Sequence, residues 1–495
     1  MTLKRVGILI FPQVEVLDFC GPFEVFSVTR ATEERRREEA PAAVGLELRG
    51  GGHDVADGRP RRARARPRAI LARVHAAGHS TVVVAPPATR VTSSTLELLS
   101  HGPFARIMLT NFFFFGALNG FLLLPLYIQR LGGDEADIGL VQGLYSAAGI
   151  VCQPVVGALI DYLGRRFFMR VGTLLLVVSC ALFVVSSPLP LLGVLRILQG
   201  VAFSTFFVAN YIHVVEMVPV ERRGWALGIF GLSGLVSTSL APLFGEFVIR
   251  RFGFPTFFMA STVIAAVAAA TCWHVRDVRP AALGARPGLH VIREGLLELR
   301  HMHMLIGLFF GLGTGTIFTF LPTFGEDLGI TSVGLFYTAY AVAAMLVRVV
   351  GGNLIDVRGR RAVIIPCMFV QAAATCIIAL VAILFAPSLG LPVLPFIFLA
   401  GFLAGAAHGF LYPAMSALLM DVTPERRRGS AVGIFSSVIL VGSSFGAIAF
   451  GYVAHGRGYA VMWSALTVLL MIGSFLSVRL RVGYAKPAPA PAPAS

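Results

Sequence analysis

The chain has 495 residues, of which 56% are hydrophobic and only 14% are charged. A water-soluble chain carries about a quarter charged residues, so most of this chain must be solvated by lipid. The formal net charge of +15 does not indicate nucleic acid binding, because most arginines lie in short loops between apolar blocks and not on one soluble face. The six cysteines have neither metal-ligand nor disulfide spacing. We therefore predict an integral membrane protein without a metal or cofactor.

The first hundred residues have a different character. Residues 3–28 contain a buried-type strand, VGILIF, followed by a turn and the start of a helix. Through Asp18, Gly21, Pro22 and Glu24, this fragment (1–30) resembles the opening of the PfpI-like, glutamine-amidotransferase-like domain, but no nucleophile elbow follows. Residues 31–103 are basic and proline-rich, which predicts a poorly ordered segment with one strand candidate at 79–91. We interpret this region as a truncated remnant, and the alternative is a cytoplasmic sensor.

From Phe104 onward, apolar residues come in blocks of about 20, the length that crosses a hydrocarbon core of roughly 30 Å. Each block must be helical, because lipid offers no partner for free backbone groups. We predict an all-α membrane protein with twelve transmembrane helices in two six-helix bundles. The bundles cover 104–274 and 303–480, joined by a connector at 275–302 and followed by a disordered Pro/Ala-rich tail at 481–495. The blocks are 105–129, 138–160, 167–187, 190–216, 225–249, 255–274, 303–325, 331–355, 362–386, 392–420, 430–453 and 459–479.

The loop charges orient these helices. With the N-terminus inside, the inner connections hold sixteen arginines and the outer ones hold four, Arg130, Arg250, Arg251 and Arg457. Because cytoplasmic loops are enriched in basic residues, we expect both termini in the cytoplasm and the helices in a bacterial inner membrane.

The two halves repeat three sequence segments in the same order. GALIDYLGRR (157–166) recurs as GNLIDVRGRR (352–361), VPVERRGWALGIF (218–230) as VTPERRRGSAVGIF (422–435), and LPLYIQRLGG (124–133) as LPTFGEDLGI (321–330). These segments resemble the major facilitator superfamily over about 375 residues, including its signature between helices two and three. The resemblance implies two related bundles around a midplane site and transport by alternating access.

In the signature, Asp161 and Asp356 stand at helix ends, where a carboxylate can face the positive end of another helix or pair with arginine. We expect a conformational latch there, and the alternative is that these charges only fix topology. One departure from the family pattern is Tyr162, in place of the usual basic residue. The expected latch residues are Gly157, Asp161, Gly164, Arg165, Arg166, Glu216, Gly352, Asp356, Gly359, Arg360, Arg361 and Asp421.

Charged residues inside apolar blocks are costly and are candidates for function. Arg196, in RILQG (196–200), resembles the family's second motif, which implies a role in proton coupling; Gln199 lies on an adjacent face and Gly200 allows close packing. The alternative is that Arg196 extends to the outer surface.

Glu246 is the clearest carboxylate within the blocks, in LAPLFGEF (240–247). This segment resembles the fifth-helix motif of proton-driven exporters, but Ala241 and Glu246 replace two of its glycines. Pro242 is expected to kink the helix. We expect Glu246 to be protonated during transport, and the alternative is that it faces water at the outer end.

Arg348 lies in the middle of the eighth block without an obvious partner, so we expect it to face a central cavity and bind an anionic group or a carboxylate. For the two histidines, a hydrogen bond between helices is favoured over a proton relay. The expected cavity-lining residues are Asn119, Asn210, His213, His408 and Tyr412.

These features predict a proton-coupled secondary transporter that exports a small organic solute. The alternatives are an importer of the same fold and a membrane-anchored regulator that uses the N-terminal piece. An enzyme is not expected, nor is ATP-driven pumping, because no G-x-x-x-x-G-K-[ST] loop occurs. The expected partners are the lipid bilayer, a small-molecule substrate and protons, without nucleic acid, and we expect a monomer.

Overall fold

The chain divides into two units, Met1–Leu99 and Ser100–Ser495. The computed structural model describes residues 45–48, 72–76, 79–83, 102–218, 223–275, 302–330, 332–351, 354–384, 393–422 and 428–480.

In the first unit, the described residues form a three-stranded antiparallel sheet. Its strands are β1 (Gly45–Leu48), β2 (Ala72–Ala76) and β3 (His79–Val83), in the order β1-β2-β3. Strand β3 coincides with the strand candidate at 79–91, whereas β1 and β2 lie where we expected no regular structure. Strands of four or five residues are too short to give a clear alternating pattern. The fragment that resembles a PfpI-like domain lies outside the described residues and stays a prediction.

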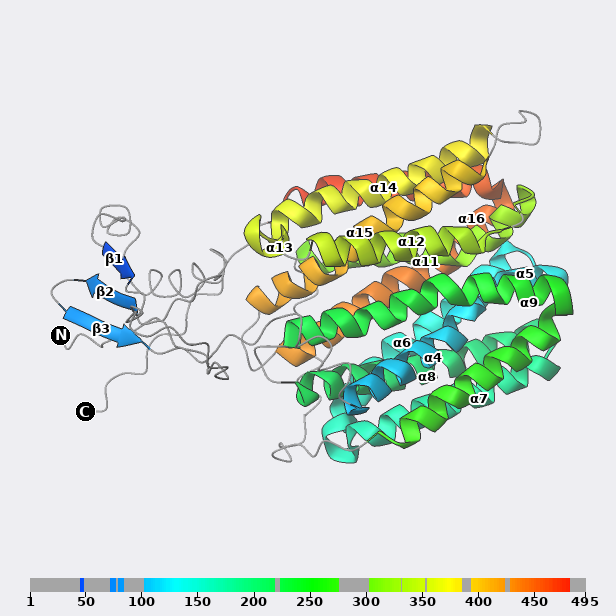
Figure 1. The fold of residues 1–495 in the computed structure, drawn as a ribbon. Coiled ribbons are helices and arrows are strands. Elements are labelled where there is room, and N and C mark those ends of the chain that lie inside the picture. Colours follow the sequence, from blue (N-terminus) through cyan, green and yellow to red (C-terminus); the bar gives the residue numbers. More distant parts are fainter. Residues whose placement is uncertain are drawn as a thin grey trace, which may run out of the picture. The chain divides into compact units, whose positions relative to one another are not determined.

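The second unit is helical throughout its described residues (Figure 1). The helices are α4 (Gly102–Gly120), the 3-10 turn η1 (Phe121–Leu123), α5 (Leu124–Arg130), α6 (Glu135–Leu163), α7 (Arg165–Val185), α8 (Leu189–Met217), α9 (Arg223–Trp273), α11 (Met302–Asp327), α12 (Gly334–Gly351), α13 (Leu354–Val357), α14 (Arg360–Leu384), α15 (Leu394–Val422) and α16 (Arg428–Ser477).

Two of these helices are too long for one membrane crossing. Helix α9 has 51 residues and α16 has 50, whereas about 20 residues suffice. Each contains one non-helical glycine, Gly253 or Gly458, at which the chain reverses, as Figure 1 shows for α9. Ten described helices are long and apolar enough to span a membrane, and counting α9 and α16 twice gives the twelve spans that the sequence predicts.

The glycines that turn the chain occur in matching pairs in the two halves. All six have a positive φ: 87° at Gly132 and 72° at Gly329, 87° at Gly164 and 83° at Gly359, and 84° at Gly253 and 78° at Gly458. A side chain would make this conformation unfavourable by about 1–2 kcal/mol. We call the end with Gly253 and Gly458 the hairpin end, and the end with Gly164 and Gly359 the arginine end.

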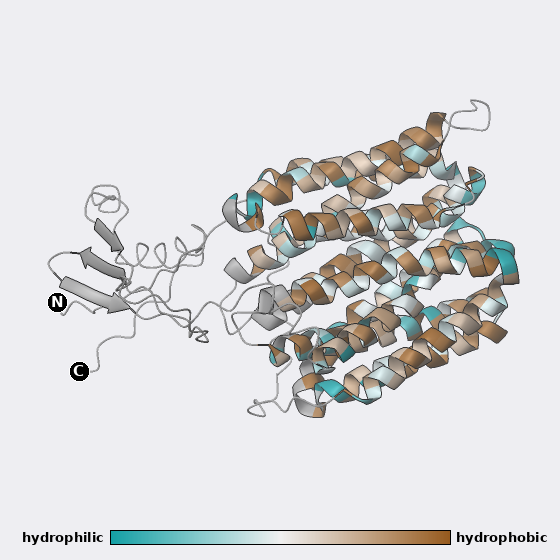
Figure 2. Ribbon diagram, in the orientation of Figure 1, coloured by the Kyte–Doolittle hydropathy of each residue, from teal (hydrophilic) through white to brown (hydrophobic). Residues whose placement is uncertain are grey.

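Hydrophobic residues make up most of the length of the helices, and hydrophilic residues gather at the turns (Figure 2). Several large apolar side chains are far more exposed than a water-soluble protein would tolerate in such number; Val151 is 71% exposed, Phe247 62% and Val349 72%. Such exposure is expected where lipid surrounds the helices.

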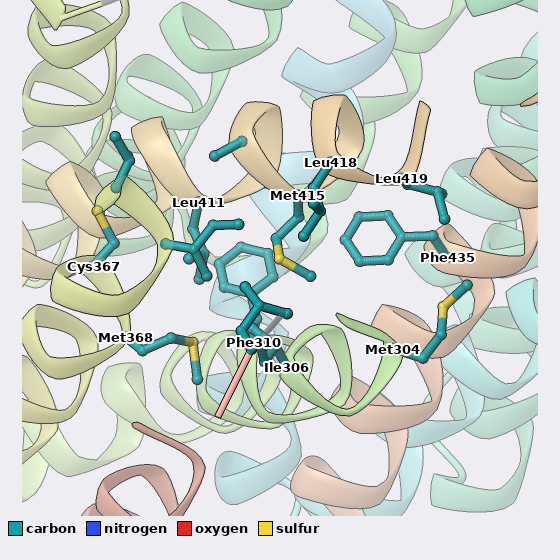
Figure 3. Close-up of a cluster of buried hydrophobic side chains, with 14 of the residues drawn as sticks. Met304, Ile306, Phe310, Cys367, Met368, Leu411, Met415, Leu418, Leu419 and Phe435 are labelled. Atoms are coloured by element: carbon teal, nitrogen blue, oxygen red, sulfur yellow. The ribbon is translucent and has the colours of Figure 1, made fainter. Parts of the chain in front are cut away.

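Each bundle has its own apolar core. In the first bundle, the rings of Phe121, Phe183 and Phe258 pack with centroids 4.8–5.8 Å apart and join η1 with α7 and α9. In the second bundle, side chains of α11, α14, α15 and α16 pack around Phe310, Met415 and Phe435 (Figure 3).

The two bundles meet along α6 with α16 and along α9 with α12. The α6–α16 contact requires glycine, because a Cβ built on Gly139 would lie 2.3 Å from the carbonyl oxygen of Ala447, and one on Gly451 would lie 2.6 Å from that of Glu135. Backbone therefore packs directly on backbone near the hairpin end.

Candidate functional site

Buried amides and hydroxyls join the helices of the first bundle. Asn210 donates to Asn111 at 3.0 Å, and Asn111 donates to Ser233 at 2.8 Å, which connects α8, α4 and α9. Asn119 donates to the hydroxyl of Thr238 at 3.0 Å. Asn119 and Asn210, expected to line a cavity, thus have side chains bonded between helices, and His213 is buried at 1% exposure.

Arg196 lies inside the first bundle and does not extend to the membrane surface. It is 6% exposed and donates to Gln199 at 2.8 Å and to Gln142 of α6. Its guanidinium also lies 4.4 Å from the ring centre of Tyr145, a favourable cation–π geometry. Gly200 lets α6 and α8 approach, since a Cβ there would lie 2.2 Å from the carbonyl oxygen of Tyr145.

A proline links this network to the first helix. Pro125, near the start of α5, has no N–H, so it cannot donate to the carbonyl four residues earlier, that of Phe121. Gln142 donates its amide to that carbonyl oxygen at 3.4 Å while its own oxygen accepts from Arg196. These contacts connect η1, α6 and α8 through the buried positive charge of Arg196.

The arginines of the duplicated signature cap helix ends within each bundle. Arg165 donates to the carbonyl of Ile160 at 3.3 Å, and its counterpart Arg360 donates to that of Ile355 at 3.0 Å. Cations favour the C-terminal ends of helices, where carbonyl groups lack partners.

The next arginine of each copy also repeats its contact. Arg166 donates to the carbonyl of Trp273 at 3.1 Å, and Arg361 donates to that of Val478 at 2.7 Å. Each arginine therefore ties the start of a bundle's third span to the end of its last span.

The latch residues are described only in part. Glu216 pairs with Arg165 at 2.8 Å, inside the first bundle. Gly164 and Gly359 form the turns described above, and a Cβ on Gly157 would meet no atom within 4 Å. Gly352 and the side chains of Asp161, Asp356 and Asp421 lie outside the part of the chain that the structure describes, so their role stays a prediction.

Glu246 is a buried carboxylate at the hairpin end, 8% exposed, and it crosses the interface between the bundles. On its own helix it accepts from Arg250 at 2.9 Å. From the other bundle it accepts the backbone N–H groups of Val333 at 3.3 Å and Gly334 at 3.0 Å, where α12 begins. A helix N-terminus has unpaired N–H groups and a partial positive charge, so Glu246 binds α12 through charge as well as hydrogen bonds. Pro242, where we expected a kink, keeps helical backbone angles within α9. The residue of this helix with non-helical backbone angles is Gly253.

Other polar contacts between the bundles lie in the same half of the helices. Near the turns, His455 lies 3.2 Å from Asp134, and Gln129 donates to Asp327 at 3.5 Å. Deeper in, Ser444 donates to the carbonyl of Gly143 at 2.9 Å. These contacts close the hairpin end.

Arg348 lies near the end of the described part of α12 that is closer to the arginine end. It reaches towards the first bundle, because a Cβ on Gly231 of α9 would lie 2.7 Å from its Nη1 atom. Its electrostatic neighbours are Tyr340, His408 and Tyr412. The histidine ring packs against these tyrosines at 5.5 and 6.3 Å between centroids.

Some residues of these networks are absent from the sequence-based predictions. Tyr145, Asp134 and His455 contact the sites above, and Tyr211 interacts electrostatically with Tyr412. Only Tyr211 could have been recognised from the sequence pattern. It follows Phe203 and Phe207 at intervals of four residues on α8, a spacing that aligns side chains on one helix face. Among the described residues, no group of three or more histidine, cysteine, aspartate or glutamate side chains lies together so that it could hold a metal ion.

Comparison with known proteins agrees with this architecture. The family model described as Major Facilitator Superfamily matches residues 105–384 and 304–495. The staphylopine export protein of Staphylococcus aureus is 24% identical over 391 residues, which cover 76% of this chain and 96% of the relative. The multidrug resistance protein MdtG of Dickeya zeae is 25% identical over 386 residues, 74% of this chain and 91% of the relative.

Two solved structures share the fold. The nucleoside transporter NupG aligns with a TM-score of 0.65 at 12% identity, over 76% of this chain and 99% of that structure. The human organic anion transporter MFSD10 aligns with a TM-score of 0.56 at 16% identity, over 76% of this chain and 98% of that structure. This chain is thus a multi-pass membrane transporter of small molecules and not an enzyme, and it belongs to the Major Facilitator Superfamily.

Proposed function

We propose that this transporter is proton-coupled and exports a small organic solute from a bacterial cytoplasm by alternating access, as a monomer. The observation that carries the proposal is the position of Glu246, a titratable group on one bundle that holds the first residues of α12 on the other. The names of two relatives, a staphylopine export protein and a multidrug resistance protein, favour export.

The arginine distribution supports the orientation needed for export. Sixteen arginines in the connections at the arginine end, against four at the hairpin end, favour a cytoplasmic arginine end. The closed hairpin end then faces outwards. The structure would correspond to the state that loads solute from the cytoplasm.

Protonation of Glu246 would then change the balance between the two access states. The neutral carboxyl group accepts weaker hydrogen bonds than the carboxylate and loses its attraction to the N-terminus of α12. Protonation from outside would therefore favour opening of the hairpin end, where solute leaves, and release of that proton to the cytoplasm would let the hairpin end close again.

At the cytoplasmic side, we propose that Asp161, Asp356 and Asp421 form the latch of the opposite state. The arginine caps support this assignment indirectly, because they make the ends of each bundle rigid. A rigid bundle end would move as one body when the latch closes.

Transport itself is the first measurement. In inverted membrane vesicles with an acidic interior, a panel of drugs and metabolites should include a solute that is taken up and releases protons as it enters. Uptake should fall to the level of empty vesicles when a protonophore collapses the gradient. Uptake that is unaffected by the protonophore would contradict proton coupling, and solute-driven flux only in the opposite direction would identify an importer.

Arg196→Ala is expected to lower gradient-driven uptake at least about tenfold, because the charge that polarises Gln142 and connects three helices is lost. The control is Arg251→Ala, which removes an exposed arginine and should leave uptake unchanged. Facilitated movement without a gradient should persist in Arg196→Ala if the residue serves coupling. Equal gradient-driven uptake in the two variants would reject this role.

A further inference from the structure

The guanidinium of Arg348 differs from those of the other arginines within the helices. Among the described residues, none accepts a hydrogen bond from it and no carboxylate pairs with it; its Nε atom is buried without a partner, as are those of Arg165, Arg166, Arg170 and Arg196, whose other nitrogens donate. Of the other arginines whose side chains the structure describes as not exposed, each donates a hydrogen bond: Arg106, Arg165, Arg166, Arg170, Arg196 and Arg360. An arginine without an acceptor in a low-dielectric interior is unfavourable, so its retention calls for an acceptor that the described residues do not supply.

Further unused polar groups lie beside this cation. The hydroxyl of Tyr340, in a side chain 3% exposed, has no hydrogen-bond partner, nor has Nδ1 of His408. Both residues are electrostatic neighbours of Arg348. A buried polar group without a partner costs free energy, and three in one place indicate that they converge on a missing group.

The hydrogen-bonding chemistry of Arg348, Tyr340 and His408 indicates what kind of group would satisfy them. Arginine offers only donors, and the tyrosine hydroxyl and the imidazole can each donate. An acceptor-rich anion satisfies all three, and a carboxylate matches the planar fork of the guanidinium. Where the structure describes the chain, no second arginine or lysine interacts with Arg348, and a single cation suits a monoanion better than a phosphate dianion.

Aromatic side chains of both bundles lie near these polar groups. On the second bundle, the rings of Phe310 and Tyr412 flank His408 at 5.3 and 6.3 Å. On the first bundle, Phe207 packs against Tyr211 at 6.4 Å, and Tyr211 interacts electrostatically with Tyr412. Both bundles therefore offer flat apolar faces near one charge.

We infer that Arg348, Tyr340 and His408 form the binding site for the carboxylate of an organic monoanion whose aromatic or apolar body packs between Tyr211 and Tyr412. This inference rests on the proposed transport function and names its substrate class. Because Arg348 reaches from the second bundle to Gly231 of the first, a bound carboxylate would also bridge the bundles.

The test is ligand binding by the full chain in detergent at one pH, which needs neither a gradient nor a direction of transport. The probes are aromatic carboxylates with their uncharged amides: benzoate and benzamide, 1-naphthoate and 1-naphthamide, indole-3-acetate and indole-3-acetamide. At least one carboxylate should raise the thermal unfolding midpoint more than its amide does. In Arg348→Gln, carboxylate affinity should fall about 10- to 100-fold, as expected for the loss of a charge-assisted hydrogen bond.

Two controls separate binding from folding. Arg251→Gln removes an exposed arginine and should keep the preference for the carboxylate. Without ligand, Arg348→Gln should unfold at the same temperature as the parent or higher, because an unpaired charge is removed. The inference fails if carboxylates and amides stabilise equally, if chloride stabilises as much as the carboxylates, or if Arg348→Gln lowers the ligand-free midpoint as a structural arginine would. If carboxylates bind as expected but the transport assay fails, only the proposal of proton-coupled export is rejected, and the carboxylate site stands.

Discussion

Replacement of Glu246 by glutamine is expected to reduce gradient-driven transport about 10- to 100-fold and to favour the state that is open at the hairpin end. Glutamine keeps the size and an acceptor oxygen but removes the charge. Two hydrogen bonds to the start of α12 then become neutral, and the attraction to the helix N-terminus is lost. The combined loss is about 1.5–3 kcal/mol, which corresponds to a 10- to 100-fold change in the ratio of the two states.

Cross-linking measures this shift directly. The side chains of Gln129 and Asp327 approach to 3.5 Å across the hairpin end, so a Gln129→Cys, Asp327→Cys pair should be joined readily by a short bifunctional thiol reagent in the closed state. Adding Glu246→Gln should slow this cross-linking at a fixed pH. Three groups face the carboxylate of Glu246: the guanidinium of Arg250 on α9, the side chain of Tyr337, and the N-terminal N–H groups of α12.

The matched control is Glu326→Gln, which neutralises an exposed carboxylate at the same end. It should change neither transport nor the rate of cross-linking. Fast cross-linking together with full transport in Glu246→Gln would mean that the carboxylate has no part in closing the hairpin end.

Gly451→Leu is expected to abolish transport while the protein remains inserted in the membrane. A Cβ at this position would lie 2.6 Å from the carbonyl oxygen of Glu135 and 3.1 Å from the Cα of Gly139. Both obstacles are backbone atoms, so the clash can be relieved only by moving α16 away from α6. Overpacking of this kind typically costs about 1–3 kcal/mol, which would make the closed hairpin end the rarer state.

The comparison variant is Gly456→Leu, on the same helix, where a Cβ would meet nothing within 4 Å. Transport in proteoliposomes and the cysteine-pair assay should distinguish the two leucines: slow cross-linking and no transport for position 451, parental behaviour for position 456. Parental transport in Gly451→Leu would show that the close contact of α6 and α16 is not needed in the cycle.

The helices could be predicted because their cause is local. Lipid excludes any backbone group without an internal partner, so each apolar block had to become one helix. The predicted block 167–187, for instance, became α7 at Arg165–Val185. The duplicated signatures predicted the two halves for the same reason, since each repeat carries its own turn glycine, such as Gly164 and Gly359.

The contacts of the candidate site could not be predicted in the same way, because they join residues far apart in the chain. Glu246 binds the backbone of residues 87 and 88 positions later, and backbone N–H groups leave no trace in a sequence. Asn119 and Asn210 appeared to suit a cavity because they are polar, but an asparagine inside a bundle is satisfied equally well by another helix. Residue type alone does not distinguish these two environments.

The paired turn glycines have a consequence for how such a chain can arise. Six spans carry each half back to the side of the membrane from which it started, so the second copy enters with the same orientation as the first. A tandem duplication of one half could therefore have been inserted without reversing either copy, and the two halves are related by an axis along the membrane normal. Gly253 and Gly458, which turn the fifth span into the sixth in each copy, would then descend from a single turn in a chain of half the length.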